Sequence, residues 1–311
     1  MSLRRKAFLT LILAPPLLTE LATGNTPAHA FLNPRVAIFL ILAYSFPLLI
    51  IRELSLRFQL SAAGVFLLGL AYGIVNEGLL AQTLLRSGHV PIDKFDHYIY
   101  VHGLNFSWAL VIVPWHAFFA VLFPLSLVAW YFPSCAQESW LSRRIFRLLT
   151  AVLVAAIAFI SAVRPPHPQM TVCFLAIAVL SAAAFFFRGS QAAPAAPGSS
   201  RAAPFFFGFL SFPLFFLGSI ILAAKRAPVP LFFFSLIFLL FIMGKTAQRR
   251  GFLYMPASAY LALGAYLSLS VFHLLAAIAS HSAEGTIVGV LLSAAFLLLA
   301  CRRRRRPAAL P

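Results

Sequence analysis

The sequence predicts an all-α polytopic integral membrane protein, and its composition, its apolar runs and its charge distribution each support this fold class. Hydrophobic residues make up 62% of the 311 residues and charged residues only 10%, with a mean hydropathy of +0.94. A soluble domain is typically about half apolar and about one quarter charged. Long apolar runs recur along the whole chain, separated by short clusters of Lys and Arg. A location in the membrane follows from these features.

The apolar runs predict about ten transmembrane helices. A helix needs roughly 20 mainly apolar residues to cross the hydrocarbon core, so charge clusters and Pro/Gly-rich breaks delimit the candidate segments. An even number of spans places both termini on the same side of the membrane. The expected spans lie near residues 7–22, 35–51, 61–85, 105–131, 145–163, 168–187, 205–224, 228–244, 252–280 and 285–301.

Lys and Arg are distributed as this topology requires. Basic residues accumulate in cytoplasmic loops, whereas the loops on the other side are poor in them. With ten spans, most of the 24 Lys and Arg residues fall on one side, which is therefore predicted to be cytoplasmic together with both termini. The membrane is expected to be a bacterial cytoplasmic (inner) membrane. The opposite side holds Arg35, Arg86, Lys94, Arg164, Lys225 and Arg226.

The first 30 residues allow two interpretations. The basic cluster Arg4-Arg5-Lys6, a short apolar run and the segment Ala28-His29-Ala30 match the layout of a cleaved signal peptide. A pair of prolines, residues 15–16, and Glu20 lie between the apolar run and that cleavage site, and they favour a first membrane span. The charge distribution of the remaining chain is the same in both cases.

A segment rich in Ala, Pro, Gly and Ser, residues 188–204, predicts a flexible cytoplasmic linker. The linker separates a six-span region, residues 1–187, from a four-span region, residues 205–301, and a basic cytoplasmic tail follows at residues 302–311. Most of the polar residues expected within the membrane belong to the six-span region. No internal repeat relates the two regions, as an inverted-repeat transporter would require.

The net charge of +17 does not indicate nucleic-acid binding. The basic residues occur in short clusters between apolar runs, and they do not form one basic surface interleaved with aromatic residues. The expected partner is the lipid bilayer, with anionic lipid at the basic cytoplasmic loops and tail. The three cysteines show no CxxC spacing, so the sequence indicates neither a disulfide framework nor a zinc knuckle.

Three ionisable residues are predicted to lie at similar depth in the outer half of the membrane. Glu77, His116 and His273 are each about 10 to 16 Å from the outer ends of their spans at 1.5 Å per residue. Ionisable groups at such depth face a partner or a water-filled cavity. The three side chains could bind a divalent metal such as zinc, or act as acid and base around a water molecule. They could equally be hydrogen-bonded packing residues without any chemistry.

Glycines near Glu77 indicate a close helix contact. Gly69 and Gly73 form a GxxxG spacing, and Gly73 shares a helix face with Glu77. Burial of Glu77 against protein is therefore favoured over exposure to lipid. At the other face of the membrane, Arg52 and Glu53 are expected to form an ordinary interfacial ion pair.

The loop at residues 92–108 is the most polar segment outside the cytoplasmic clusters, and it is expected to cover the candidate site. Its tyrosines and Trp108 favour anchoring at the membrane interface, as a short interfacial or re-entrant element. The polar residues expected to form this cap are Asn76, Asp96, His97, His102 and Asn105.

The segments NEGLL and PWHAFF, in consecutive predicted spans, resemble motifs of the CPBP family of CAAX-protease and bacteriocin-processing intramembrane enzymes. Glu77, His116 and His273 are the positions that match the glutamate and histidines of that family. The resemblance implies that Glu77 activates a water molecule, that the histidines bind metal or stabilise an oxyanion, and that the substrate is a prenylated or membrane-borne peptide. The chain departs from the family motifs at Asn76, Ala81, Ile112 and Ala277.

The sequence is therefore compatible with three functions. The first is a non-enzymatic membrane protein with a structural, assembly or lipid-associated role, as in an uncharacterised bacterial multi-pass family. The second is an intramembrane hydrolase. The third is a transporter or channel in which Glu77 and the histidines relay protons or cations.

Overall fold

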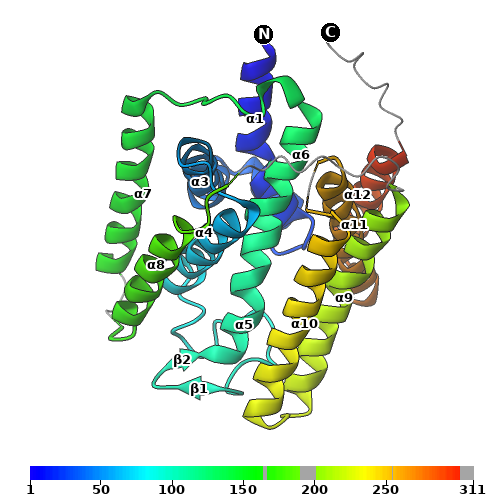
Figure 1. The fold of residues 1–311 in the computed structure, drawn as a ribbon. Coiled ribbons are helices and arrows are strands. Elements are labelled where there is room, and N and C mark those ends of the chain that lie inside the picture. The colour runs from blue at the N-terminus through cyan, green and yellow to red at the C-terminus, as the bar shows by residue number, and fades with distance from the viewer. Residues whose placement is uncertain (164–166, 190–200, 254, 302–311) are drawn as a thin grey trace.

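In a computed structural model the described part of the chain is a bundle of helices with one small β-hairpin (Figure 1). The structure describes residues 1–163, 167–189, 201–253 and 255–301. The predicted basic tail and most of the predicted linker lie outside the described residues. The elements are α1 (Leu3–Pro16), α2 (Pro34–Leu40), α3 (Phe46–Arg57), α4 (Ala62–Ile74), β1 (Tyr100–Val101), β2 (Leu104–Asn105), α5 (Phe106–Trp115), α6 (Phe123–Tyr131), α7 (Arg143–Val163), α8 (Met170–Ala184), α9 (Ala202–Ala224), α10 (Val229–Arg249), α11 (Ala257–Ala279) and α12 (Ala283–Cys301).

Eight helices of the described chain are long and apolar enough to cross a membrane. The prediction of an all-α polytopic membrane protein is thus confirmed, and eight of the ten expected spans correspond to these helices. The other two expected spans are helical but differ from the rest. The N-terminal helix carries Arg4, Arg5, Lys6 and Glu20, and α8 has only 15 residues against the roughly 20 that a perpendicular span needs.

Four segments of π-helix interrupt the first four helical runs. They are Leu17–Leu21 after α1, Ile41–Ser45 between α2 and α3, Val75–Leu80 after α4, and His116–Leu122 between α5 and α6. Proline lacks the N–H that an α-helix uses, so the hydrogen-bond register is weakest near it. Prolines adjoin three of the four segments, as in Pro15-Pro16 and Pro114. Such π-helical turns are rare and occur frequently at functional sites.

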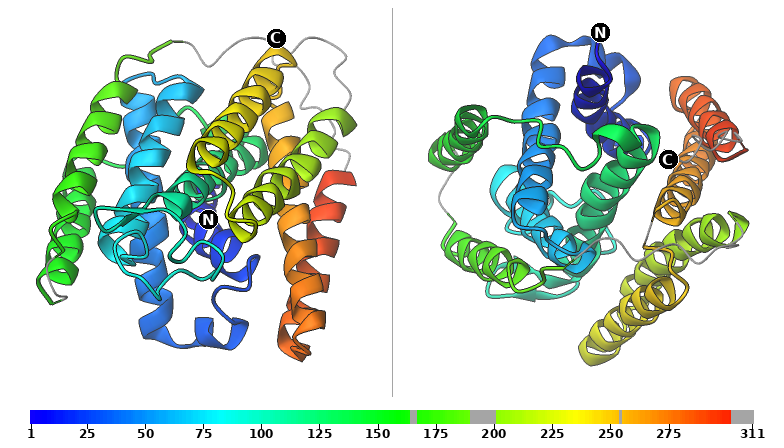
Figure 2. Two further views of the ribbon diagram at one scale, coloured as in Figure 1. Left: turned by 90° about the horizontal axis from the view of Figure 1, so that it is seen from below. Right: turned by 45° about the horizontal axis from the view of Figure 1, so that its top comes forward.

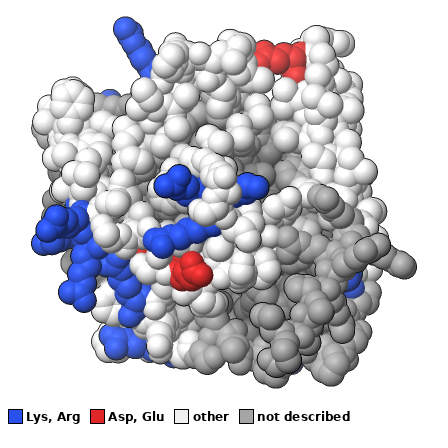
Figure 3. All heavy atoms as spheres, turned by 90° about the horizontal axis from the view of Figure 1, so that it is seen from above, with Lys and Arg blue, Asp and Glu red and all other residues white. Residues whose placement is uncertain are grey.

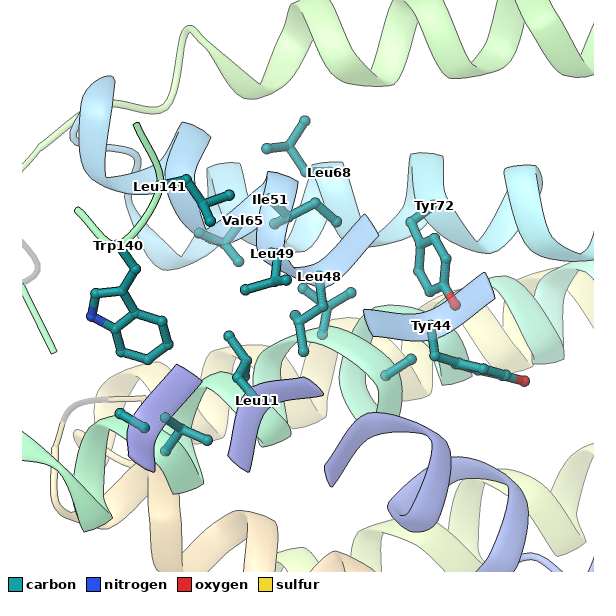
Figure 4. Close-up of a cluster of buried hydrophobic side chains, with 14 of the residues drawn as sticks. Leu11, Tyr44, Leu48, Leu49, Ile51, Val65, Leu68, Tyr72, Trp140 and Leu141 are labelled. Carbon is teal, nitrogen blue, oxygen red and sulfur yellow. The ribbon is translucent and has the colours of Figure 1, made fainter. Parts of the chain in front are cut away.

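The first six helices enclose an apolar cluster that α1, α3 and α4 share. Leu11, Leu48 and Val65 belong to it and are almost completely buried. In Figure 4, Tyr44 and Tyr72 lie at one end of this cluster, and Trp140 lies at the other end. The cluster therefore connects two polar sites, which are described below. Helices α7 and α8 lie at the periphery of this group (Figures 1 and 2).

Helices α9, α11 and α12 form a second group beside the first (Figure 2). Gly208 on α9 and Gly264 on α11 allow the backbones to meet. A Cβ atom at Gly208 would lie 2.1 Å from the carbonyl oxygen of Leu261, and one at Gly264 would lie 2.0 Å from that of Phe205. Close backbone approach at small residues is the usual way in which membrane helices associate. Tyr266 and Phe119 join the two groups through a hydrogen bond of 2.5 Å from the tyrosine hydroxyl to the carbonyl oxygen.

Basic residues from distant parts of the sequence gather at one end of the bundle. Arg4 of α1 donates to the carbonyl oxygen of Trp140, and Arg57 of α3 donates to that of Leu141. The face seen in Figure 3 carries clusters of Lys and Arg with few acidic residues. The loop at residues 86–105 lies at the opposite end (Figure 1), where the Tyr98 hydroxyl donates to the carbonyl oxygen of Ala227.

Candidate functional site

Glu77 and His116 lie together between the first four helical runs. The Oε1 atom of Glu77 is 3.5 Å from the Nε2 atom of His116, and the two side chains are 11% and 1% exposed. Each residue belongs to a π-helical segment, Val75–Leu80 or His116–Leu122. The local winding therefore directs an acid and an imidazole towards each other across the contact between two helices.

Small residues set the distance between these two helices. A Cβ atom at Gly73 would lie 2.8 Å from the carbonyl oxygen of Val113 and 3.2 Å from Cβ of His116. One turn earlier, a Cβ atom at Gly69 would lie 2.8 Å from Cα of Ala117. Only glycine permits this approach, which brings Glu77 within reach of His116.

The second carboxylate oxygen of Glu77 is held by the chain that follows it. The hydroxyl of Thr83 donates a short hydrogen bond to Oε2 of Glu77, and the indole N–H of Trp108 donates to the Thr83 hydroxyl at 3.0 Å. Trp108 is 3% exposed. Oε2 is thus fixed, and Oε1 is the oxygen that faces the imidazole.

The hydrogen bond at Nδ1 of the His116 ring determines the tautomer of this residue. Nδ1 lies 3.0 Å from the carbonyl oxygen of Ile112, which can only accept, so Nδ1 carries a hydrogen. In the neutral imidazole, Nε2 is then an acceptor, and among the described residues this buried atom has no hydrogen-bond partner. A single proton could reside on Oε1 of Glu77 or on Nε2 of His116. The pair carries no net charge in either arrangement.

Aromatic rings connect this pair to a second buried acid. Tyr44 stacks on His116 with ring centroids 6.1 Å apart and planes inclined by 9°, and Tyr72 contacts both rings edge-on. The Tyr44 hydroxyl donates a short hydrogen bond to Glu20. Glu20 is 7% exposed, and the hydroxyl of Thr26 donates to its other oxygen at 2.6 Å.

Each of the four π-helical segments contributes a polar residue to this set of contacts. Glu20 lies in the first, Tyr44 in the second, Glu77 in the third and His116 in the fourth. We call these four residues the buried polar network. Asn76 adjoins it, because its amide donates to the Tyr72 hydroxyl at 2.9 Å.

The predicted polar cap divides into buried and exposed parts. Asn105 is 1% exposed and caps the start of α5, where its side chain accepts from the N–H of Trp108. Asp96 accepts from the N–H of Gly88, and His97 and His102 are exposed. In this loop, burial raises the pKa of Tyr100 to about 12, assisted by the neighbouring Asp96 carboxylate.

His273 contacts a different part of the molecule. Its ring packs against Gly24, where a Cβ atom would lie 2.5 Å from Nε2, and against Gly285. The turn containing Gly24 follows Glu20, so His273 lies on the Glu20 side of the network. Within the described ranges, no group of three or more His, Cys, Asp and Glu side chains could hold a metal ion. The arrangement of donors therefore does not match a three-ligand zinc site.

Arg52 and Glu53 form a buried cluster, which differs from the ordinary interfacial pair expected from the sequence. Glu53 is completely buried, and its oxygens accept from both neighbouring arginines, from Ser139 and from the N–H of Trp140 at 2.7 Å. Arg52 donates to three carbonyl oxygens of residues 135–138 and stacks on Trp140 at 3.4 Å. The expected ion pair is therefore present, and it is buried because the loop at residues 132–142 folds back over the end of α3.

Fold and network together define a polytopic, all-α integral membrane protein with a buried acid–histidine pair. The chain belongs to a family described as an uncharacterized membrane protein family, whose model matches residues 8–311. This match gives no support to the CPBP resemblance. The searches of curated proteins and of solved structures gave no match.

Proposed function

We propose that this protein exchanges protons at the Glu77–His116 pair as part of a membrane transport function. The observation that carries the proposal is the Nε2 atom of His116, which makes no hydrogen bond among the described residues and lies 3.5 Å from Oε1 of Glu77 inside the bundle. A hydrogen bond forms at about 2.7–3.2 Å, so a small approach of the two helices would allow the proton to move. Ionisable groups within a membrane typically mark proton or ion pathways.

The π-helical segments support movement at this pair. A π-helical turn closes its hydrogen bonds over five residues instead of the four of an α-helical turn, and such turns occur frequently at functional sites. Both members of the pair lie in such segments. A change of winding in either segment would change the distance between Glu77 and His116 and thereby couple protonation to helix position.

An experiment on protonation itself can test this proposal without knowledge of the transported species. Infrared difference spectra of the purified protein across a pH series should contain the carbonyl band of a protonated carboxylic acid that disappears as the pH rises. Glu77→Gln should remove this band, because an amide cannot release the proton. Glu138→Gln, at an exposed carboxylate, is the matched control and should leave the band unchanged.

The same variants should also be tested in proteoliposomes that contain a trapped pH-sensitive dye. Proton movement driven by a potassium gradient should decrease in Glu77→Gln and remain at the wild-type level in Glu138→Gln. Identical infrared titrations of the wild type and Glu77→Gln would mean that Glu77 is a packing acid, and the proposal would then be abandoned.

An intramembrane hydrolase is the second candidate. Its support is the pairing of Glu77 with His116, since the CPBP resemblance assigns water activation to that glutamate and a supporting role to that histidine. Neither residue is among the described residues that line the large cavity discussed below, which weakens this candidate. Cleavage of a membrane-borne peptide that Glu77→Gln abolishes would favour hydrolysis over proton exchange.

We further propose a bacterial cytoplasmic membrane as the location, with the basic end of the bundle on the cytoplasmic side. The clusters of Lys and Arg at that end support this orientation. Anionic lipid at the basic loops is the corresponding partner.

A further inference from the structure

A long cavity of about 1740 Å³ lies between α10 and a wall formed by α4, α5, α6 and α8. On α10 its lining extends from Phe233 to Gln248, about 22 Å at 1.5 Å per residue. Pockets for small ligands usually have volumes of about 300–1,000 Å³. Ile237 and Phe241 line the cavity and are 52% and 57% exposed, so the cavity is open on this side. The cavity is therefore a groove with a lateral opening towards the surrounding lipid, and we call it the α10 groove.

The two ends of the α10 groove differ in polarity. Phe and Leu side chains such as Phe66, Leu110 and Phe233 dominate its length. Lys245 and Gln248 lie at its basic end, since α10 runs towards the end of the bundle that carries Arg52 (Figure 1). Arg52 and Lys245 are the basic residues of the described lining, and that lining holds no carboxylate. The groove thus combines an apolar length with a positively charged end.

We propose that the α10 groove binds an anionic glycerophospholipid from the leaflet at the basic end of the bundle. The acyl chains would lie along the apolar walls, and the phosphate would approach the Lys245 ammonium. A zwitterionic lipid fits the same walls but gains less from the positive charge of Lys245, so this charge determines the preference. This inference is independent of proton exchange at Glu77 and His116.

Lys245 and Arg52 have different roles in this site. The donors of Arg52 are already directed at Glu53 and at three carbonyl oxygens, and the Glu53 carboxylate balances the charge of Arg52, so Arg52 makes no direct contact with the lipid phosphate. Lys245 is exposed, with its ammonium 5.8 Å from the centre of the Phe241 ring. Lys245 is the residue that can reach a phosphate.

Two glycines provide a matched pair of variants for the groove. Gly244 lines the cavity and Gly218 on α9 does not, and a Cβ atom at either position would meet no atom within 4 Å. Gly244→Phe should therefore fill the groove without distorting the fold, and Gly218→Phe is its control. For the charge, Lys245→Gln is compared with Arg249→Gln, which lies on the same helix outside the groove.

The experiment measures the lipid retained by the purified full-length protein. Delipidated protein in detergent is incubated with phosphatidylglycerol or phosphatidylcholine, separated from free lipid and analysed by quantitative mass spectrometry. Wild-type protein, Gly218→Phe and Arg249→Gln should retain phosphatidylglycerol in preference to phosphatidylcholine. Gly244→Phe should lose both lipids. Lys245→Gln should reduce the preference about fivefold, which corresponds to roughly 1 kcal/mol for one basic residue near anionic lipid.

Two results would overturn the proposal. If Gly244→Phe retains as much phosphatidylglycerol as Gly218→Phe, lipid binds elsewhere on the protein. If Lys245→Gln and Arg249→Gln show the same preference as the wild type, the groove holds lipid without selecting its charge. Lys245→Gln alters an exposed side chain only, so it remains a valid test if Gly244→Phe fails to fold.

Discussion

A single methyl group at Gly73 should loosen both the contact between α4 and α5 and the Glu77–His116 pair. In Gly73→Ala, the new Cβ atom would lie 2.8 Å from the carbonyl oxygen and 3.0 Å from Cα of Val113. These are backbone atoms, so they cannot rotate away. The helices must separate by about 0.6 Å to reach an ordinary contact distance, and overpacking of this kind costs about 1–3 kcal/mol. The separation would add to the 3.5 Å between Glu77 and His116.

The assay is the free energy of unfolding of purified protein in mixed micelles titrated with SDS, followed by circular dichroism. Gly73→Ala should lower this free energy by about 1–3 kcal/mol. Gly244→Ala is the control, because its Cβ atom enters open space, and it should remain within about 0.5 kcal/mol of the wild type. Equal free energies for the two variants would refute the close helix contact, and with it the explanation of why Glu77 reaches His116.

Three further predictions concern the ends of the molecule. Glu53→Ala should lower the free energy of unfolding by about 3–5 kcal/mol, because the substitution leaves the Arg52 guanidinium buried without its carboxylate partner. Glu138→Ala, at an exposed carboxylate, is the control and should change this free energy little. Reporter fusions after Arg147 and Arg250 should report a cytoplasmic location and a fusion near Asp93 an external one; one reversed signal would refute this topology. Intact mass spectrometry of the purified protein should find residues 1–30 retained, since α1 is part of the core, and cleavage within that segment would contradict its buried position.

The sequence predicted the fold class and the proximity of Glu77 to His116 for a simple reason. Apolar run length fixes which segments are helices, and a rise of 1.5 Å per residue fixes the depth of each residue. The glycines near Glu77 also indicated a close helix contact. Depth does not fix the direction in which a side chain points, however. His273 is at a comparable predicted depth, yet it packs against Gly24 and Gly285.

The contact between Glu20 and Tyr44, which forms the other half of the buried polar network, could not be predicted from the sequence. Glu20 was visible as an acid in an apolar run, but its partner Tyr44 is 24 residues away and looks like an ordinary aromatic residue of a span. The π-helical segments leave no separate signal, because their hydrophobic pattern differs little from that of an α-helix over five to seven residues. The neighbouring prolines were the available indication of irregular winding.

The two buried ionic sites at opposite ends of the first apolar cluster differ in how completely their hydrogen bonds are formed. Both oxygens of Glu53 accept hydrogen bonds, and both terminal nitrogens of Arg52 donate them. Such a site cannot change partners without breaking contacts, so it stabilises the end of α3 and the following loop. The Glu77–His116 pair instead retains a buried nitrogen that, among the described residues, makes no hydrogen bond. A buried polar atom without a hydrogen bond is energetically unfavourable, and a bound water molecule, an ion or a functional role at that atom can offset the cost. Exchange of one proton between Glu77 and His116, as proposed above, would use this nitrogen, because the exchange needs an acceptor that no hydrogen-bond donor among the described residues occupies.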